Sequence, residues 1–272
     1  MDIIDGKKIA EEIVSHLKIL PKPNKFFGAA LVGEDPASLN FLKQKSKVAE
    51  ELSIEFRTYR LPRDIKTDEL RREIGRLAGA KTCGGFIAQL PLPEHVNRHY
   101  VLNAIPKEKD ADLLGEAALG AFYTGRHIVV PPSVGVVEEI LKRQKLNMRE
   151  LKVVLIGAGF LIGKPVGFWL QNRVAEVTVF DEHAKQLSAK LKDADVVISG
   201  VSEAGLLKVA DLKSGALVID FGWSRAEGKI VGDFNPEGAE KKDISYTKTP
   251  GGTGPILVAK LFENFYKLNS CK

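Results

Sequence analysis

Short apolar runs alternate with segments of helical periodicity along nearly the whole chain, and this alternation constrains the fold more than any other feature. In the first half, strands are expected at 26–32, 54–59 and 85–89. Helices are expected around them, at 6–20, 36–52 and 67–77. Alternating strands and helices of these lengths predict right-handed βαβ units, and hence a parallel sheet with helices on both faces.

The alternation restarts after a loop-like stretch at 104–132. The second series of strands is expected at 151–156, 176–180, 194–199 and 216–221, with helices at 134–146, 161–170, 184–191 and 256–268. A chain of 272 residues has room for about two domains. We therefore predict an α/β fold in two domains that meet near residues 120–135.

Composition narrows the partners that such a chain can have. The net charge is +5, but acidic and basic residues are interspersed along the expected helices and aromatic residues make up only 7%, unlike a nucleic-acid binder. No apolar run approaches the roughly 20 residues that cross a bilayer, and the N-terminus has no apolar signal region. Cys83 and Cys271 suggest neither a disulfide framework nor a metal site. We expect a cytoplasmic protein that binds small anionic molecules.

A glycine-rich turn follows the first expected strand of the second half, in LKVVLIGAGFLIG at 151–163. Gly157 permits the tight turn, Gly159 lets a pyrophosphate approach the backbone, and Gly163 permits close packing of the following helix. The start of that helix offers free N–H groups to phosphates. This context predicts a Rossmann-like dinucleotide site, with a plain tight turn as the alternative.

Asp181 ends the next expected strand, 22 positions after Gly159. A carboxylate there accepts hydrogen bonds from the adenosine ribose hydroxyls and repels a 2′-phosphate. The alternative is that Asp181 only caps the following helix. The dinucleotide site and the preference for NAD are therefore two separate predictions.

Three further segments carry a resemblance that extends over nearly the whole chain. They are QLPLP at 89–93, IGKP at 162–165 and PGGTGP at 250–255, and they follow PASLNFLKQK, in which Phe41 and Lys45 share one helix face. In this order and spacing the segments resemble the bifunctional methylenetetrahydrofolate dehydrogenase/cyclohydrolase family. The resemblance implies two α/β domains around a cleft, with the last helix returning to the first. The implied domains are 1–120 with 255–272 for folate and catalysis, and 121–254 for NAD(P).

The resemblance also implies residue roles for a hydride transfer followed by a hydrolysis. Lys45 would be the main catalytic group, Gln89 would orient it, and Asp112 would hold the pterin. The implied substrate-binding residues are Ser38, Phe41, Pro250, Gly251 and Gly252. The implied cofactor-binding residues are Gly157, Ala158, Gly159, Ile162, Gly163, Asp181 and Val201. The family also implies a homodimer.

Several positions depart from the family pattern. Phe41 replaces a tyrosine, which removes a hydroxyl near the lysine, and Leu113 replaces a glycine. Ala158 and Gly159 replace an arginine–serine pair. NADP is the default cofactor of the family, whereas Asp181 and the missing arginine favour NAD in this chain. We therefore expect a dehydrogenase with a weakened cyclohydrolase. The alternatives are another two-domain NAD(P) dehydrogenase and a non-catalytic protein that binds dinucleotide or folate.

Overall fold

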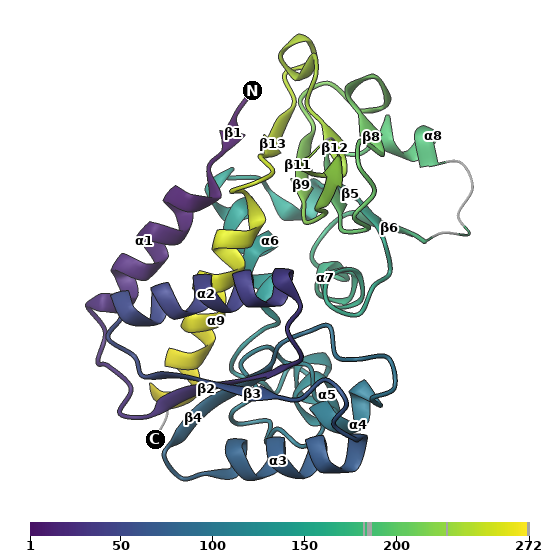
Figure 1. Ribbon diagram of the computed structural model, residues 1–272. Coiled ribbons are helices and arrows are strands. Elements are labelled where there is room, and N and C mark those ends of the chain that lie inside the picture. The colour runs from purple at the N-terminus through teal and green to yellow at the C-terminus, as the bar shows by residue number, and fades with distance from the viewer. Residues whose placement is uncertain (182, 184–186, 227, 271–272) are drawn as a thin grey trace. The chain divides into compact units, whose positions relative to one another are not determined.

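The computed structural model describes residues 1–181, 183, 187–226 and 228–270, which divide into two compact units (Figure 1). Unit 1 comprises Met1–Ala10 and Ser133–Leu257, and unit 2 comprises Glu11–Pro132 and Val258–Lys272. Helices α1 (Gly6–Lys18) and α9 (Thr253–Ser270) contribute residues to both units, and the first residue of α6 (Pro132–Arg143) belongs to unit 2. Relative to the expected ranges, the first ten residues belong with the second half of the chain.

Unit 2 is built on a parallel sheet of three strands in the order β3-β2-β4. In Figure 1, α2 and α3 lie on opposite faces of this sheet. The elements of unit 2 are β2 (Phe26–Val32), α2 (Pro36–Glu51), β3 (Phe56–Leu61), α3 (Thr67–Gly79), β4 (Cys83–Ala88), α4 (Arg98–Leu102) and α5 (Glu116–Tyr123).

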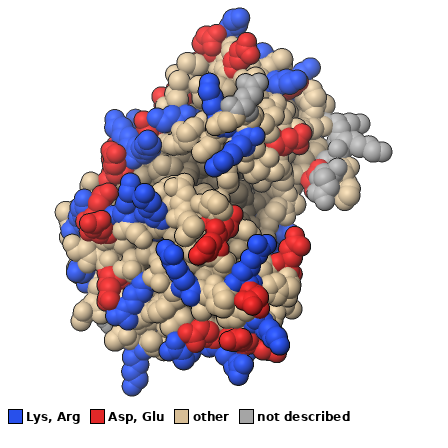
Figure 2. Space-filling model, viewed as in Figure 1, with Lys and Arg blue, Asp and Glu red and all other residues tan. Residues whose placement is uncertain are grey.

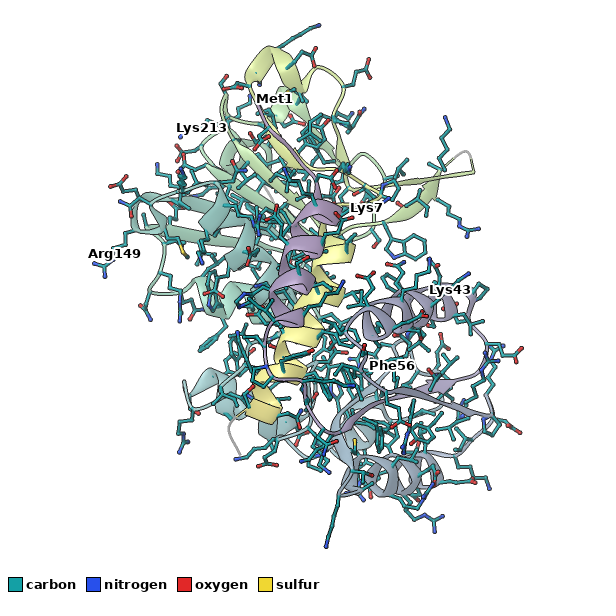
Figure 3. The ribbon with its side chains drawn as sticks, turned by 90° about the vertical axis from the view of Figure 1, so that its left-hand side faces the viewer. Met1, Lys7, Lys43, Phe56, Arg149 and Lys213 are labelled. Atoms are coloured by element: carbon teal, nitrogen blue, oxygen red, sulfur yellow. The ribbon has the colours of Figure 1, made fainter. Side chains whose placement is uncertain are left out.

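Aromatic side chains fill the core of unit 2. Phe27 on β2 stacks on Phe265 of α9 with ring centroids 4.7 Å apart, and it meets Phe262 and Phe56 edge-on. Figure 3 shows where Phe56 lies on the ribbon. Offset and edge-on pairs of this kind stabilise a core beyond the area that they bury. The C-terminal part of α9 is therefore an integral part of unit 2.

Unit 1 holds a parallel sheet of six strands in the order β1-β13-β9-β7-β5-β6. Its strands are β1 (Ile3–Ile4), β5 (Lys152–Ile156), β6 (Glu176–Phe180), β7 (Val196–Ser199), β9 (Leu217–Asp220) and β13 (Ser245–Thr247). Its further helices are α6 (Pro132–Arg143), α7 (Gly163–Leu170) and α8 (Leu187–Leu191). Smaller two-stranded pairs are formed by β10 (Ser224–Ala226) with β11 (Lys229–Val231) and by β8 (Leu207–Lys208) with β12 (Phe234–Asn235).

The sheet order places a topological switch point at β5. The chain passes from β5 to β6 on one side and then returns to β7 on the other side. In open α/β sheets, ligands bind outside the carboxyl ends of the strands at such a point. The predicted α/β fold with a Rossmann-like second domain is confirmed. The switch point predicts a dinucleotide site at the loops that follow Ile156 and Ser199.

Two expectations about individual elements need correction, and one short strand, β1, was not expected. Residues 116–123, expected within a loop, form α5, whose Ala118 and Phe122 are buried one turn apart. The strand expected at 54–59 lies at Phe56–Leu61, because Ser53 takes a left-handed conformation (φ 54°) that ends α2. The short β1 carries no periodicity of its own and forms only because it pairs with β13. The helix expected at 184–191 is described only as α8, and its first three residues, like Cys271, lie outside the described residues.

Two findings concern the surface. On the face drawn in Figure 2, lysine and arginine are interspersed with aspartate and glutamate. Among the described residues, no helix has both the length and the apolar character needed to span a membrane.

Candidate active site and dinucleotide site

Helix α2 carries three of the predicted site residues. It begins where the Asp35 carboxylate accepts a hydrogen bond from the backbone N–H of Ser38 at 2.7 Å, with Pro36 in its first turn. Ser38 and Lys45 belong to its buried face, and Phe41 is half-buried one turn before Lys45. Because this face turns toward the core, the lysine is held inside the unit instead of extending into solvent.

Lys45 and Gln89 meet at the end of β4. The Lys45 ammonium donates to Gln89 Oε1 at 2.9 Å, and the Gln89 amide donates to the Leu90 carbonyl at 2.8 Å. Ser38 Oγ donates to the same carbonyl at 3.3 Å. These contacts join two residues of α2 to the segment that follows β4, and they fix the amide orientation that presents an oxygen to Lys45.

Asp112 is the electrostatic counterpart of Lys45. Burial lowers the pKa of Lys45, which is 9% exposed, and the charge of Asp112 opposes this shift. Burial likewise raises the pKa of the half-buried Asp112, and Lys45 opposes that shift. A lysine with a lowered pKa next to an acid with a raised one is an arrangement suited to proton transfer.

The turn that carries Asp112 contains a residue that sequence reasoning missed. Asp110 is 1% exposed, and its Oδ2 accepts from the backbone N–H groups of Leu114 at 3.0 Å and Gly115 at 2.7 Å. Burial, with a smaller contribution from Asp112, raises the pKa of Asp110 to about 7. Within this turn Leu113 takes a left-handed conformation (φ 54°), which explains why a glycine stands there in the family pattern.

The glycine-rich turn lies at the switch point of unit 1. Gly157 has φ 94°, which the turn requires, and its N–H donates to the Phe180 carbonyl at 2.7 Å. A Cβ atom on Gly163 would come within 1.8 Å of the Gly157 carbonyl oxygen, so α7 packs directly on the turn. A Cβ on Gly159 would meet no atom within 4 Å, and Ala158 and Gly159 are both exposed. The turn thus leaves open backbone where a phosphate can approach.

Ile162 and Val201 lie beside this turn. A Cβ on Gly157 would come within 2.7 Å of Val201 Cγ1, and one on Gly200 within 3.1 Å of Ile162 Cδ1. The loop after β7 therefore contacts both the glycine turn and the residue that precedes α7. Five predicted cofactor-binding residues, Gly157, Ala158, Ile162, Gly163 and Val201, are grouped by these contacts and by the chain itself.

Asp181 directly follows β6, next to the glycine turn. It is exposed, and its Oδ1 accepts from the backbone N–H of His183 at 3.0 Å. This bond forms a local turn two residues long, whereas the described part of α8 begins only at Leu187. The position matches that of the acid that contacts the ribose in dinucleotide-binding folds.

The loop at 250–252 joins β13 to α9 within unit 1. Gly251 has φ 98°, and the Thr249–Pro250 peptide bond is cis. Gly252 is buried and its carbonyl oxygen lies against Gly6, where a Cβ would come within 1.7 Å. Thr253 Oγ1 donates to the Asp220 carbonyl at 2.9 Å and ties the start of α9 to the end of β9.

Two buried acids that sequence reasoning left without a role lie at the ends of strands in the same unit. Asp220 ends β9, and Asp233 precedes β12; they are 2% and 0% exposed. Asp220 stands directly after the apolar run 216–219, which was the available signal, whereas no such run precedes Asp233. No group of three or more histidine, cysteine or acidic residues among the described parts of the chain could hold a metal ion.

The chain matches two family models. Residues 4–112 match "Tetrahydrofolate dehydrogenase/cyclohydrolase, catalytic domain", and residues 131–272 match "Tetrahydrofolate dehydrogenase/cyclohydrolase, NAD(P)-binding domain". The chain is 35% identical to a bifunctional protein FolD of Halothermothrix orenii over 276 residues, covering 97% of this chain and 96% of that protein.

Solved structures agree with these matches. The bifunctional enzyme FolD of Campylobacter jejuni superposes with a TM-score of 0.93 at 32% identity, covering 99% of this chain and 98% of that one. A Trypanosoma brucei methylenetetrahydrofolate dehydrogenase-cyclohydrolase, solved with NADP and an inhibitor, gives a TM-score of 0.90 at 28% identity, with 98% and 96% coverage.

Proposed function

Since the chain belongs to the tetrahydrofolate dehydrogenase/cyclohydrolase family, we propose that it catalyses both reactions named in that description. It oxidises 5,10-methylenetetrahydrofolate to the 5,10-methenyl form with NAD(P)⁺, and it hydrolyses the methenyl product to 10-formyltetrahydrofolate. The observation that carries the proposal is the buried Lys45, hydrogen-bonded to Gln89 and electrostatically coupled to Asp112.

In the first reaction a C–H bond of the methylene bridge breaks, and its electron pair leaves with the hydrogen as hydride. Bound NAD(P)⁺ supplies the acceptor for this hydride. The open backbone at Gly159 and the turn at Gly157 fit the pyrophosphate of such a group. The chain's contribution to this step is to hold two partners in reacting geometry, which is an entropic and orientational effect.

In the second reaction the oxygen of water bonds to the methenyl carbon. A proton passes from the attacking water to the Lys45 amine, and then from Lys45 to N5 of the folate as the bond between the carbon and N5 breaks. The second proton of the water is released to solvent as the formyl carbonyl forms. Burial lowers the pKa of Lys45, which favours the neutral amine, and only the neutral amine can accept the proton of the attacking water and then return it.

The remaining predicted residues have binding roles. Gln89 orients the Lys45 nitrogen, and Asp112 accepts hydrogen bonds from the amino and ring N–H groups of the pterin. Phe41 offers a ring on which the aminobenzoate of the folate can stack, and Ser38 lies on the buried face of the same helix. We assign Pro250, Gly251 and Gly252 to substrate binding because the family pattern implies it.

We propose NAD as the preferred cofactor. The Asp181 carboxylate stands next to the glycine turn and would repel a 2′-phosphate, and the arginine of the family pattern is absent from Ala158–Gly159. Arg173 is a basic residue in the same unit that a 2′-phosphate could attract, and it donates to the Trp169 carbonyl at 2.8 Å. The test compares kcat/KM for NAD⁺ and NADP⁺ in the wild type and in Asp181→Ser. We expect the variant to gain on NADP⁺; a wild type that prefers NADP⁺ would contradict the assignment.

One spectrophotometric experiment tests both activities. Methylenetetrahydrofolate with NAD⁺ or NADP⁺ should give reduced cofactor, and methenyltetrahydrofolate supplied alone should be hydrolysed faster than in buffer. Binding of either ligand without turnover would favour the non-catalytic alternative.

The homodimer and the cytoplasmic location are also proposals that rest on the family. If the protein is a homodimer, light scattering should give twice the mass of one chain.

A further inference from the structure

The buried carboxylate of Asp233 holds the loop that follows β7. Its Oδ2 accepts from Ser199 Oγ at 2.6 Å and from the Val201 N–H at 3.0 Å, and its Oδ1 accepts from the Glu203 N–H at 2.8 Å. Three donors from five consecutive residues thus converge on one side chain that is fully buried. A carboxylate has acceptor sites for all of them, whereas an amide has only one oxygen.

The backbone around Asp233 fixes the rest of the same loop. The Asp233 carbonyl accepts from the Leu207 N–H at 2.8 Å, and the Gly232 carbonyl accepts from the Gly205 N–H at 3.2 Å. The loop from 199 to 207 is therefore bound along its length to 232–233. Its position is set by this contact and by the register of β7.

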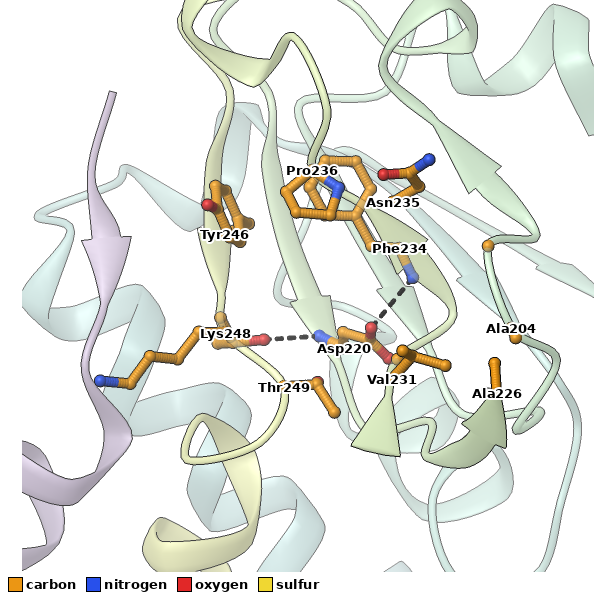
Figure 4. A pocket seen from close by; sticks show the side chains of 13 residues that line it. Ala204, Asp220, Ala226, Val231, Phe234, Asn235, Pro236, Tyr246, Lys248 and Thr249 are labelled. Carbon is orange, nitrogen blue, oxygen red and sulfur yellow. Dashed lines mark hydrogen bonds between the residues drawn. The ribbon is translucent and has the colours of Figure 1, made fainter. Parts of the chain in front are cut away.

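Asp220 forms the other half of this arrangement, which we name the carboxylate clamp (Asp220 and Asp233). Its Oδ1 accepts from the Gly222 N–H at 2.8 Å and its Oδ2 from the Phe234 N–H at 3.0 Å, the second bond being drawn in Figure 4. A Cβ on Gly222 would lie 2.0 Å from Asp233 Oδ1, so the Asp233 carboxylate packs directly on the loop after β9. The clamp thus joins the loops after β7 and β9, which are neighbouring strands.

The loop that Asp233 holds contains Val201, whose side chain lies against Gly157 of the glycine turn. We propose that Asp233 is a positioning residue for the dinucleotide: it sets the loop after β7 against the glycine turn and so shapes the wall of the cofactor site. This inference rests on the proposed function of unit 1. Asp233 itself does not take part in the reaction, and it acts on the cofactor through Val201 and its neighbours.

The proposal separates the two activities, because Lys45, Gln89 and Asp112 belong to unit 2 and the hydrolysis of supplied methenyltetrahydrofolate uses no hydride acceptor. In Asp233→Asn an N–H group replaces one acceptor oxygen and faces the backbone donors. We expect the KM for the preferred cofactor to rise and the dehydrogenase kcat/KM for it to fall by about ten- to a hundredfold, as displaced binding groups do. The cyclohydrolase kcat should stay within about twofold of the wild type.

Asp195→Asn is the matched control. Asp195 stands at the opposite end of β7, where its Oδ2 accepts from the Lys152 N–H at 2.9 Å and its Oδ1 pairs with Lys213. This variant also loses an acceptor next to the same strand, and it should leave the cofactor KM unchanged. Melting temperatures of both variants report their effects on stability.

Each outcome decides the proposal. A selective rise of the cofactor KM in Asp233→Asn supports it, whereas an equal loss of both activities or no change in either overturns it. If Asp233→Asn does not fold, Ser199→Ala, which removes one of the three donors, takes its place: an unchanged cofactor KM then overturns the proposal, and a selective rise supports it. A wild-type chain that reduces neither cofactor would instead refute the proposed function.

Discussion

Leu113 permits a test of the turn that carries Asp112. It is fully buried and yet has φ 54°, a conformation that L-residues other than asparagine and aspartate rarely adopt. Replacement by alanine removes the buried side chain and keeps the strained backbone. Replacement by glycine removes the same side chain and relieves the strain as well.

The magnitudes follow from these two facts. Loss of a buried leucine side chain costs about 2–5 kcal/mol of the free energy of unfolding. The left-handed conformation costs an L-residue about 1–2 kcal/mol, and glycine loses about 0.5–1 kcal/mol more than alanine through chain entropy. Leu113→Gly should therefore be as stable as Leu113→Ala or more stable by up to about 1.5 kcal/mol. At an ordinary helical position the glycine variant is the less stable one.

Leu102 supplies the control, since it is also fully buried and ends the helix α4 in the same unit. Chemical denaturation of the four variants gives the difference between glycine and alanine at each position. We expect glycine to be about 0.5–1 kcal/mol worse than alanine at 102, and equal or better at 113. The same penalty at both positions would refute the conformation assigned to Leu113 and, with it, the account of why a glycine stands there in the family pattern.

Two further predictions concern unit 2. Burial raises the pKa of Asp110 to about 7 from 3.8, so between these values the folded state retains a proton that the unfolded state has lost, and stability falls as pH rises. Asp110→Asn should remove this component, seen as a flatter dependence of the denaturation midpoint on pH between 4 and 7; an unchanged slope would contradict it. Phe41→Tyr should restore the missing hydroxyl and raise the cyclohydrolase rate by about ten- to a hundredfold with little effect on the dehydrogenase. No change in hydrolysis would mean that the hydroxyl is not limiting.

The sequence predicted well those features that depend on local periodicity and on short-range geometry. The strands 26–32 and 176–180 have the expected bounds. The first is a continuous apolar run that ends at Gly33, and the second alternates valine with glutamate and threonine before Phe180 and ends at Asp181. The approach of Gly163 to Gly157 also followed from spacing, because the strand, the turn and the helix are contiguous in the chain.

Features that depend on distant segments could not be predicted in this way. β1 has only two residues and exists because β13, from the other end of the chain, pairs with it. The roles of Asp220 and Asp233 follow from a meeting of two loops that sequence spacing does not reveal. The hydrogen bond from Lys45 to Gln89 spans 44 positions, so only the family resemblance indicated it.

The central claim is that the buried Lys45 carries the protons of the hydrolysis, and Lys45→Met tests it most directly. The control is Lys43→Met, because Lys43 stands two positions away on α2 and is exposed (Figure 3). The measurement is the rate of hydrolysis of supplied methenyltetrahydrofolate by each variant. Loss of the general acid and base should lower it by about 10²–10⁴ in Lys45→Met, with a cooperative unfolding transition retained and Lys43→Met close to the wild type. Hydrolysis at the wild-type rate by a folded Lys45→Met would contradict the account.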